Sequence, residues 1–140
     1  MKIDLQKIEK LIKKRGAVII SSIDKSGFPN TKAMLPSRKN EGLKTFYFST
    51  NTSSIRVNQY RQNPKACIYF FSKGLIHYWG VMLKGEMEVR EDAEIKKLIW
   101  RTGDNIYYPK GVTDPDYCVL KFTAAEGRFY SDLKTESFTI

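Results

Sequence analysis

Apolar residues follow two different periods along the chain, and each change of period marks a boundary between a predicted helix and a predicted strand. Residues 4–15 have helical spacing and lie between Asp4, a candidate N-cap, and Gly16, a candidate C-terminal stop. Helical spacing returns at residues 52–62 and 95–99. Stretches rich in β-branched and aromatic residues predict seven strands, at residues 17–23, 30–36, 43–49, 66–71, 75–89, 117–123 and 125–131.

The order of these elements predicts the fold class. A helix is followed by three strands, a helix, two strands, a helix and two strands, with mostly short connections that favour antiparallel pairing. Gly80 and Gly85 indicate bends or bulges that would curve the sheet. We therefore expect a mainly β fold, a six- to seven-stranded, mostly antiparallel barrel with peripheral helices. A chain of 140 residues has the usual size of one domain, so residues 1–140 are expected to form a single domain.

The composition changes this picture little. The chain is 41% hydrophobic and 28% charged, which is typical of a soluble globular protein. No apolar run approaches the roughly 20 residues that span a membrane. The N-terminal residues also lack the pattern of a secretory signal. These features predict a cytoplasmic protein without a membrane partner.

Cysteine and histidine are too few to predict a metal or redox site. Cys67 and Cys118 lie in separate apolar stretches without Cys-x-x-Cys spacing, so buried free thiols are expected. His77 is the sole histidine, which leaves zinc and a Ser-His-Asp triad without their usual residues. No metal site is predicted, and no catalytic residue is named.

The net charge of +9 favours an anionic partner, such as a nucleic acid, phospholipid headgroups or a phosphorylated ligand. The lysines are scattered through the first helix and several turns, and a solvated surface explains most of them. A nucleic-acid-binding barrel, in which tyrosine and phenylalanine on strands would stack on bases, is an alternative that the charge alone does not decide.

The segment from Ser49 to Arg56 is the strongest local indication of a ligand. A predicted strand ends there in a cluster of hydroxyl groups and runs directly into a predicted helix with Arg56 in its first turn. The N–H groups at a helix N-terminus favour an anion, and an arginine fork matches phosphate oxygens. Simple helix capping by Ser and Thr is the other interpretation of the same pattern.

Two motifs resemble the FMN-binding split barrels of the pyridoxamine-phosphate-oxidase-like superfamily. The first is the turn Gly27-Phe28-Pro29 with the strand that follows it. In that superfamily the matching strand supplies a basic residue to the flavin phosphate and backbone groups to the ring, so the resemblance implies these roles for Lys32, Ala33 and Met34. The second is a strand end and helix start, which in that superfamily hold the phosphate and ribityl chain; the resemblance implies this role for Ser49, Thr50, Ser53, Ser54 and Arg56.

A third set of residues resembles the general stress protein 26 branch of that superfamily. It comprises Trp100, residues 107–111, and residues 114–117 with the strand that follows, so the resemblance covers nearly the entire chain. It implies an FMN-binding split barrel that forms a homodimer with FMN at the subunit interface. Several aromatic side chains are candidates for the ring pocket, although plain core is the other interpretation; they are Trp79, Trp100, Tyr107 and Phe129.

The resemblance implies a flavoprotein that acts as an FMN-dependent oxidoreductase, with a nicotinamide cofactor as candidate electron donor. Oxidation of pyridoxamine phosphate itself is not expected. Gly80 stands where those oxidases carry a glutamine, and no histidine follows His77 to form their Arg-x-His motif. A stress protein that carries or senses flavin without turnover remains an alternative. Haem or a deazaflavin in place of FMN is a variant of that idea, with His77 the sole histidine available as a haem ligand.

Overall fold

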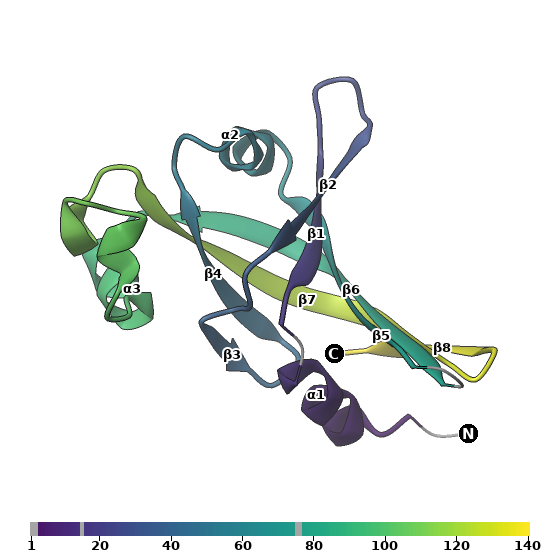
Figure 1. The fold of residues 1–140 in the computed structure, drawn as a ribbon. Helices are drawn as coiled ribbons and strands as arrows, with labels where there is room; N and C mark the ends of the chain where they lie inside the picture. Colours follow the sequence, from purple (N-terminus) through teal and green to yellow (C-terminus); the bar gives the residue numbers. More distant parts are fainter. Residues whose placement is uncertain (1–2, 15, 75–76) are drawn as a thin grey trace.

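The protein is mostly β, and in the computed structural model its strands belong to one antiparallel sheet (Figure 1). The structure describes residues 3–14, 16–74 and 77–140. The strands are β1 (Val18–Ile23), β2 (Pro29–Met34), β3 (Lys39–Glu41), β4 (Thr45–Asn51), β5 (Lys65–Lys73), β6 (Tyr78–Arg90), β7 (Tyr117–Ser131) and β8 (Lys134–Thr139). The helices are α1 (Leu5–Lys13), α2 (Ile55–Gln62) and α3 (Ala93–Ile99), with short 3-10 turns η1 (Asp104–Ile106) and η2 (Gly111–Thr113).

The sheet order explains why the barrel is split. The strands run β2-β1-β5-β6-β7-β4-β3, and β8 pairs with β7 outside this path. The sheet is curved, so that β1, β2 and β4 cross in front of β6 and β7 in Figure 1. Strand β2 is at one end of this path and β4 is next to last at the other, and they do not pair with each other, yet both line one cavity. The opening between these two strands is therefore the split in the barrel.

The main core fills the inside of the curved sheet. Successive side chains of a strand point to opposite faces, so alternate residues of five strands meet there. The most buried of them are Ile20, Phe46, Phe48, Ile68, Val81, Leu83, Leu120 and Phe122. Helix α1 covers one end of this core with Ile8 and Ile12, and its N-terminus is capped by the Asp4 carboxylate, which accepts from the N–H of Gln6 and Lys7.

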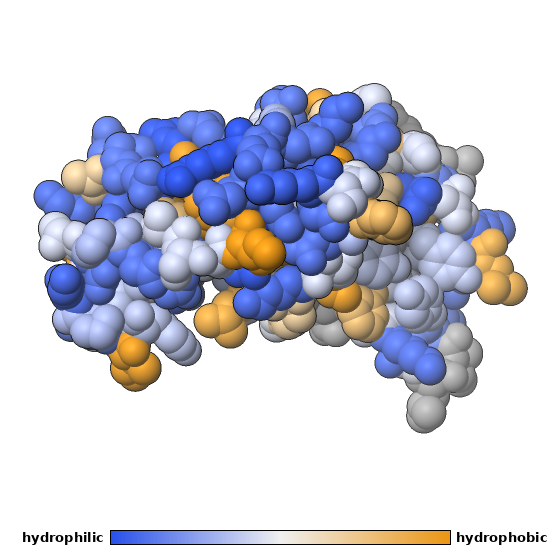
Figure 2. All heavy atoms as spheres, turned by 90° about the horizontal axis from the view of Figure 1, so that it is seen from above, coloured by the Kyte–Doolittle hydropathy of each residue, from blue (hydrophilic) through white to orange (hydrophobic). Residues whose placement is uncertain are grey.

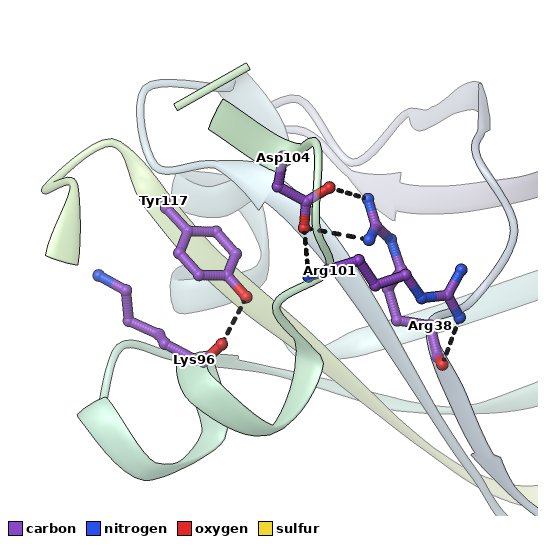
Figure 3. A network of polar contacts seen from close by, with 5 residues as sticks. All are labelled: Arg38, Lys96, Arg101, Asp104 and Tyr117. Carbon is purple, nitrogen blue, oxygen red and sulfur yellow. Dashed lines mark hydrogen bonds and ion pairs between the residues drawn. The ribbon is translucent and has the colours of Figure 1, made fainter. Parts of the chain in front are cut away.

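A second, smaller core lies on the opposite face of β4 and β7. Its members are Tyr47, Ile95, Ile99, Tyr108, Tyr117 and Val119, which come from these strands, from α3 and from the segment after it. Tyr117 donates a hydrogen bond of 2.9 Å from its hydroxyl to the carbonyl oxygen of Lys96 (Figure 3). This packing fixes the segment of residues 103–116, in which the sequence predicts a loop with no helix or strand.

The expected fold class is confirmed, and the strand count is the main difference. Among the described residues there are eight strands, because β3 and β8 occur where no strand is predicted, while two of the seven predicted strands are one. The strands predicted at 117–123 and 125–131 form one continuous strand, β7, which bends where the register shifts between Lys84 and Gly85 of β6. There a Cβ on Gly85 would lie 2.0 Å from the carbonyl oxygen of Thr123.

Strand β8 escapes prediction because its turn has an unusual sequence. Asp132 and Leu133 have φ values of 50° and 65°, the left-handed conformation that tight hairpins require and that Asn-Gly or Asp-Gly usually supplies. Residue 15 at the end of the first predicted helix and residues 75–76 at the start of the predicted strand 75–89 lie outside the described residues. The remaining predicted elements agree with the structure to within a few residues.

The face of the molecule that is seen from above is mainly polar. Seen from above, hydrophilic residues cover most of the face, and apolar residues form small, separate groups (Figure 2). Scattered apolar residues of this kind are normal for a folded protein surface. No helix in the described part of the chain is long and apolar enough to cross a membrane.

Candidate functional site

A cavity of 400 Å³ lies between β2 and β4 and receives residues from both ends of the sheet. It is lined by Ala17, Lys32, Ala33, Met34, Leu35, Pro36, Arg38, Ser49, Thr50, Asn51, Arg56, Tyr107 and Tyr108. Three of these side chains are cationic, and none of the described lining residues is acidic. The lining therefore favours an anionic ligand.

The start of α2 beside this cavity holds polar groups that lack partners. Four buried side-chain atoms have no hydrogen-bond partner among the described residues, and all lie within the segment 49–56: Ser49 Oγ, Thr52 Oγ1, Ser54 Oγ and Arg56 Nε. Ser49 and Thr52 lie near Tyr117 and Cys118, but without hydrogen-bond geometry. Unpaired buried polar atoms are costly and rare, so their concentration here indicates a site that a polar ligand completes.

Arg56 is the buried cation of this site. Its residue is 7% exposed, and burial lowers the pKa of its guanidinium below the ordinary value. One Nη atom donates to the Thr50 hydroxyl at 3.3 Å, while Nε has no partner. Lys32, on the facing strand, is exposed and has no acidic partner among the described ion pairs. Lys32 and Arg56 thus line one cavity and retain hydrogen-bond donors that a ligand could use.

Two sets of hydrogen bonds position the start of α2. The carboxylate of Asp116 accepts from the side chain of Asn51 at 2.9 Å and from the N–H of Ser53 at 2.8 Å, so the turn before the helix is held from the β7 side. Further along α2, the Gln59 side-chain oxygen accepts from the hydroxyl of Ser22 and from the amide of Asn30 at 3.0 Å. These bonds tie α2 to the β1–β2 hairpin that carries Lys32.

Arg38, the third cation that lines the cavity, forms an ion pair (Figure 3). The guanidinium of Arg38 donates two hydrogen bonds to the carboxylate of Asp104, at 2.8 and 3.1 Å. The same carboxylate accepts from the N–H of Arg101 at 2.9 Å, and Arg101 donates from its side chain to the carbonyl oxygen of Arg38 at 2.8 Å. Because Asp104 neutralises Arg38, the free positive charge of the cavity comes from Lys32 and Arg56.

Comparison with known proteins identifies the family. The family model described as pyridoxamine 5'-phosphate oxidase matches residues 5–131. The chain belongs to the pyridoxamine 5'-phosphate oxidase family. This membership agrees with the split barrel that the structure shows.

Individual members of the family extend this result. The pyridoxine/pyridoxamine 5'-phosphate oxidase of Pseudomonas paraeruginosa is 29% identical over 104 residues, which are 74% of this chain and 43% of that protein. The chain thus spans less than half the length of this curated relative. A Clostridium acetobutylicum protein related to general stress protein 26 is 39% identical, with a TM-score of 0.87 over 99% of this chain and 97% of its own.

One structural neighbour shows that the fold also occurs in a haem-binding protein. The heme binding protein of Mycobacterium smegmatis has a TM-score of 0.77 over 99% of this chain and 59% of its own. Its identity to this chain is 13%, so the likeness concerns the fold alone. In the protein described here the one histidine, His77, is not among the residues that line the cavity between β2 and β4, and its side chain is 81% exposed.

The structure brings together most of the residues that sequence motifs single out. Lys32, Ala33, Met34, Ser49, Thr50 and Arg56 all line the cavity between β2 and β4. Ser54 is the N-terminal flanking residue of α2 and is half-buried beside them. Ser53 is exposed and turns its N–H to Asp116, and Trp79 packs against the main core from β6. Neither Ser53 nor Trp79 lines the cavity of a single chain.

Sequence patterns miss several residues of the cavity. Arg38 is interpreted from sequence as part of a turn, and its partner Asp104 is 66 positions away, so no local pattern connects them. Asn51 and Tyr108 also line the cavity without being predicted, while Tyr107, a candidate for the ring pocket, does line it. Of the other candidates, Trp100 packs in the second core and Phe129 against the main core.

Proposed function

We propose that the protein binds FMN in the cavity between β2 and β4 and uses it as a flavin-dependent oxidoreductase. One observation carries the proposal: Ser49 and Arg56, which have buried polar atoms without partners, line one cavity with the free cation Lys32, and none of its described lining residues is acidic. A phosphate dianion supplies the acceptors that these donors lack. The neutral ribityl hydroxyls suit the Ser and Thr side chains at the end of β4.

The residues present fit FMN at each of its parts. Lys32 and Arg56 would hold the phosphate, together with hydroxyl groups of the segment 49–54. Backbone groups of Ala33 and Met34 on the exposed strand β2 would face the ring, since among the described strands β2 pairs with β1 alone and its other edge is unpaired. Bound flavin supplies the hydride or electron chemistry, and this chain contributes position and electrostatics.

The proposal includes a homodimer with FMN at the subunit interface. Strands β5, β6 and β7 carry partly exposed apolar side chains on the face that points away from the core, namely Tyr69, Phe71, Met82 and Tyr130. A twofold mate on this face would bury them. Trp79, which one chain does not bring to its own cavity, is proposed to contact FMN only through such an interface.

We do not extend to this chain the oxidation of pyridoxamine phosphate for which the curated relatives are named. A Cβ on Gly80 would lie 2.2 Å from the hydroxyl oxygen of Tyr69, so the Tyr69 phenol occupies the space of a side chain at position 80. The glutamine expected of those oxidases therefore has no room there unless Tyr69 moves. A nicotinamide cofactor is proposed as the electron donor instead.

A carrier or sensor of FMN is the second candidate function. The described lining of the cavity includes no His, Cys, Asp or Glu, so no side chain there acts readily as a proton donor or acceptor near neutral pH. Repeated reoxidation of the bound flavin by an added acceptor, after reduction by NADH or NADPH, supports the oxidoreductase. Absence of sustained turnover supports the carrier.

The deciding experiment compares FMN with riboflavin, which lacks the phosphate. Wild-type protein should purify yellow or take up FMN, and should bind riboflavin at least about 100-fold more weakly, since each charge-assisted hydrogen bond contributes about 1.5–3 kcal/mol. The double variant Lys32→Ala/Arg56→Ala should remove this preference for FMN. Lys25→Ala/Arg61→Ala, with the same loss of charge at exposed positions, is the matched control. FMN retained by the first variant at wild-type affinity would show that the phosphate binds elsewhere.

A further inference from the structure

The exposed ring of Tyr107 lies at the wall of the cavity, although its backbone is held firmly. Its residue is 57% exposed and lines the cavity together with Tyr108. Its N–H donates to the carbonyl oxygen of Asp104 at 2.9 Å, and the N–H of Tyr108 donates to the same oxygen at 3.0 Å. An aromatic ring that is open to solvent on a fixed backbone presents a ready surface to a bound ligand.

A set of contacts through Asp104 connects this backbone to Arg38, and the Asp104–Arg38 part of it is drawn in Figure 3. The Asp104 carboxylate pairs with Arg38 at 2.8 Å, and the two side chains are 5% and 11% exposed. The backbone carbonyl of the same Asp104 holds both tyrosine amides. The Arg38–Asp104 ion pair therefore connects the backbone of Tyr107 to the segment beside β4.

Tyr108 fixes the segment from its other side. Its ring is 4.8 Å from that of Tyr117 and 6.1 Å from that of Trp100, measured between centroids, and its burial raises the pKa of its hydroxyl to about 12. Tyr108 is thus part of the second core, whereas the neighbouring ring of Tyr107 is not. One tyrosine anchors the segment and the other remains available.

The ion pair that is connected to the Tyr107 backbone lies further along β4 from the position where Arg56 contacts the strand. The N–H of Arg38 donates to the carbonyl oxygen of Tyr47 at 2.7 Å, so the ion pair lies beside β4 three residues before Thr50, which binds Arg56. Three residues of a strand span roughly 10 Å. That length is comparable with the reach of a ribityl chain between a phosphate at Arg56 and a ring near Tyr107.

We propose that Tyr107 contacts the isoalloxazine ring of FMN and that Asp104 is the positioning residue that holds it there through its ion pair with Arg38. This inference rests on the proposed binding of FMN in the cavity. Tyr107 contributes the aromatic wall of the ring site, a role that depends on its ring and not on its hydroxyl. Asp104 acts through the backbone of residues 104–108.

The fluorescence of bound FMN tests the role of Tyr107, because an aromatic side chain in contact with the flavin ring quenches its emission. Tyr107→Leu should raise the emission of bound FMN severalfold and weaken binding about tenfold, which corresponds to the energy of an aromatic contact. Tyr107→Phe should retain both properties. Ile106→Ala, at a residue that is 83% exposed in the same loop but does not line the cavity, is the matched control.

The role of Asp104 is tested by the same two measurements. Asp104→Asn should raise the emission of bound FMN and weaken binding severalfold, because the tyrosine backbone loses its fixed position. Since this variant leaves Arg38 buried without a charge partner, the double variant Arg38→Leu/Asp104→Leu provides a second test in a fold without an unpaired charge. Both should show the raised emission while the far-UV circular dichroism stays that of the wild type.

The outcomes separate the two levels of the proposal. Wild-type protein that does not bind FMN would overturn the proposed function and this inference with it. Wild-type protein that binds FMN, with Tyr107→Leu equal to Ile106→Ala in emission and affinity, would overturn the contact with Tyr107 alone. Altered Tyr107→Leu with unaltered Asp104 variants would keep the contact and overturn the positioning role of Asp104.

Discussion

The two helices that directly follow strands, α2 and α3, begin in nearly the same backbone conformation, but the side chain before α3 caps its helix and the side chain before α2 does not. Asp92 precedes α3 with φ −66° and ψ 142°, and Ser54 precedes α2 with φ −68° and ψ 145°. The Asp92 carboxylate accepts from the N–H of Ile95 at 3.3 Å. The Ser54 hydroxyl makes no capping bond and is buried without a partner.

Charge follows the same contrast. The first turn of α3 carries Glu94, which suits the positive end of the helix dipole. The first turn of α2 has no acidic residue and carries Arg56, whose positive charge opposes the dipole. The start of α3 thus stabilises the fold by itself, whereas the start of α2 lacks an anion. The difference teaches that a favoured capping residue in the sequence, Ser54 here, does not by itself show that a helix is capped.

The largest effect is expected from replacing the cation at the start of α2. Arg56→Met should weaken FMN binding about 10- to 150-fold, because it removes a charge-assisted hydrogen bond. It should also raise the free energy of unfolding of the ligand-free protein by about 1 kcal/mol, because an incompletely paired buried guanidinium is replaced by an apolar side chain. Titration with FMN and urea denaturation measure the two effects.

The matched control is Arg61→Met on the same helix. Arg61 has a side chain that is 44% exposed and pairs with Glu91 at 2.9 Å. Exposed pairs contribute little, so this variant should change the free energy of unfolding by less than about 0.5 kcal/mol and leave FMN binding unchanged. An Arg56→Met variant that is less stable than wild type without ligand would contradict the interpretation of α2 as an open site.

A smaller effect separates the two capping positions. Asp92→Ala should lower the free energy of unfolding by about 1 kcal/mol, the usual contribution of an N-cap. Ser54→Ala should lower it by less than about 0.5 kcal/mol in the ligand-free protein, because no capping bond is lost. In the presence of FMN, Ser54→Ala should become the more destabilising of the two substitutions, since it weakens FMN binding severalfold and Asp92→Ala does not. Equal destabilisation by both substitutions in urea would show that Ser54 caps α2 in solution.

The sequence predicts the parts of this comparison that depend on neighbouring residues. The hydroxyl-rich segment before α2 and its arginine fall within eight positions, so a pattern indicates an anion site there. The alternation of apolar residues likewise predicts most strands, and the turn after Ile23 gives the β1–β2 hairpin. Local information suffices where the chain itself brings the interacting groups together.

Contacts between distant residues were beyond the reach of such patterns. Arg38 meets Asp104 only because the segment after α3 packs on the outer face of β4 and β7. Asp116 holds the turn before α2 from 63 positions away, at Ser53. Whether Ser54 caps its helix depends on where a side chain points, which the residue type leaves open.

The smallest expected effect is the loss of stability at low pH, which again differs between the starts of α2 and α3. A hydrogen bond from Arg90 holds the pKa of Asp92 below its ordinary value. Hydrogen bonds from the side chain of Asn51 and from the N–H of Ser53 likewise lower the pKa of Asp116. A carboxyl whose pKa is lower in the folded than in the unfolded state contributes stability above its ordinary pKa of about 3.9. That contribution disappears as the pH falls through the lower, folded value.

Protonation of Asp92 should therefore destabilise the start of α3, which it caps, and protonation of Asp116 should destabilise the turn before α2. Asp92→Asn and Asp116→Asn should each make the melting temperature fall less steeply than in wild type as the pH is lowered from about 6 to about 3. Only Asp116→Asn should also weaken FMN binding at neutral pH, because Asp116 holds the turn that leads into the site. Thermal denaturation across a pH series, with FMN titrations at neutral pH, measures both. Equal FMN affinities for the two variants would show that the turn before α2 keeps its shape without Asp116.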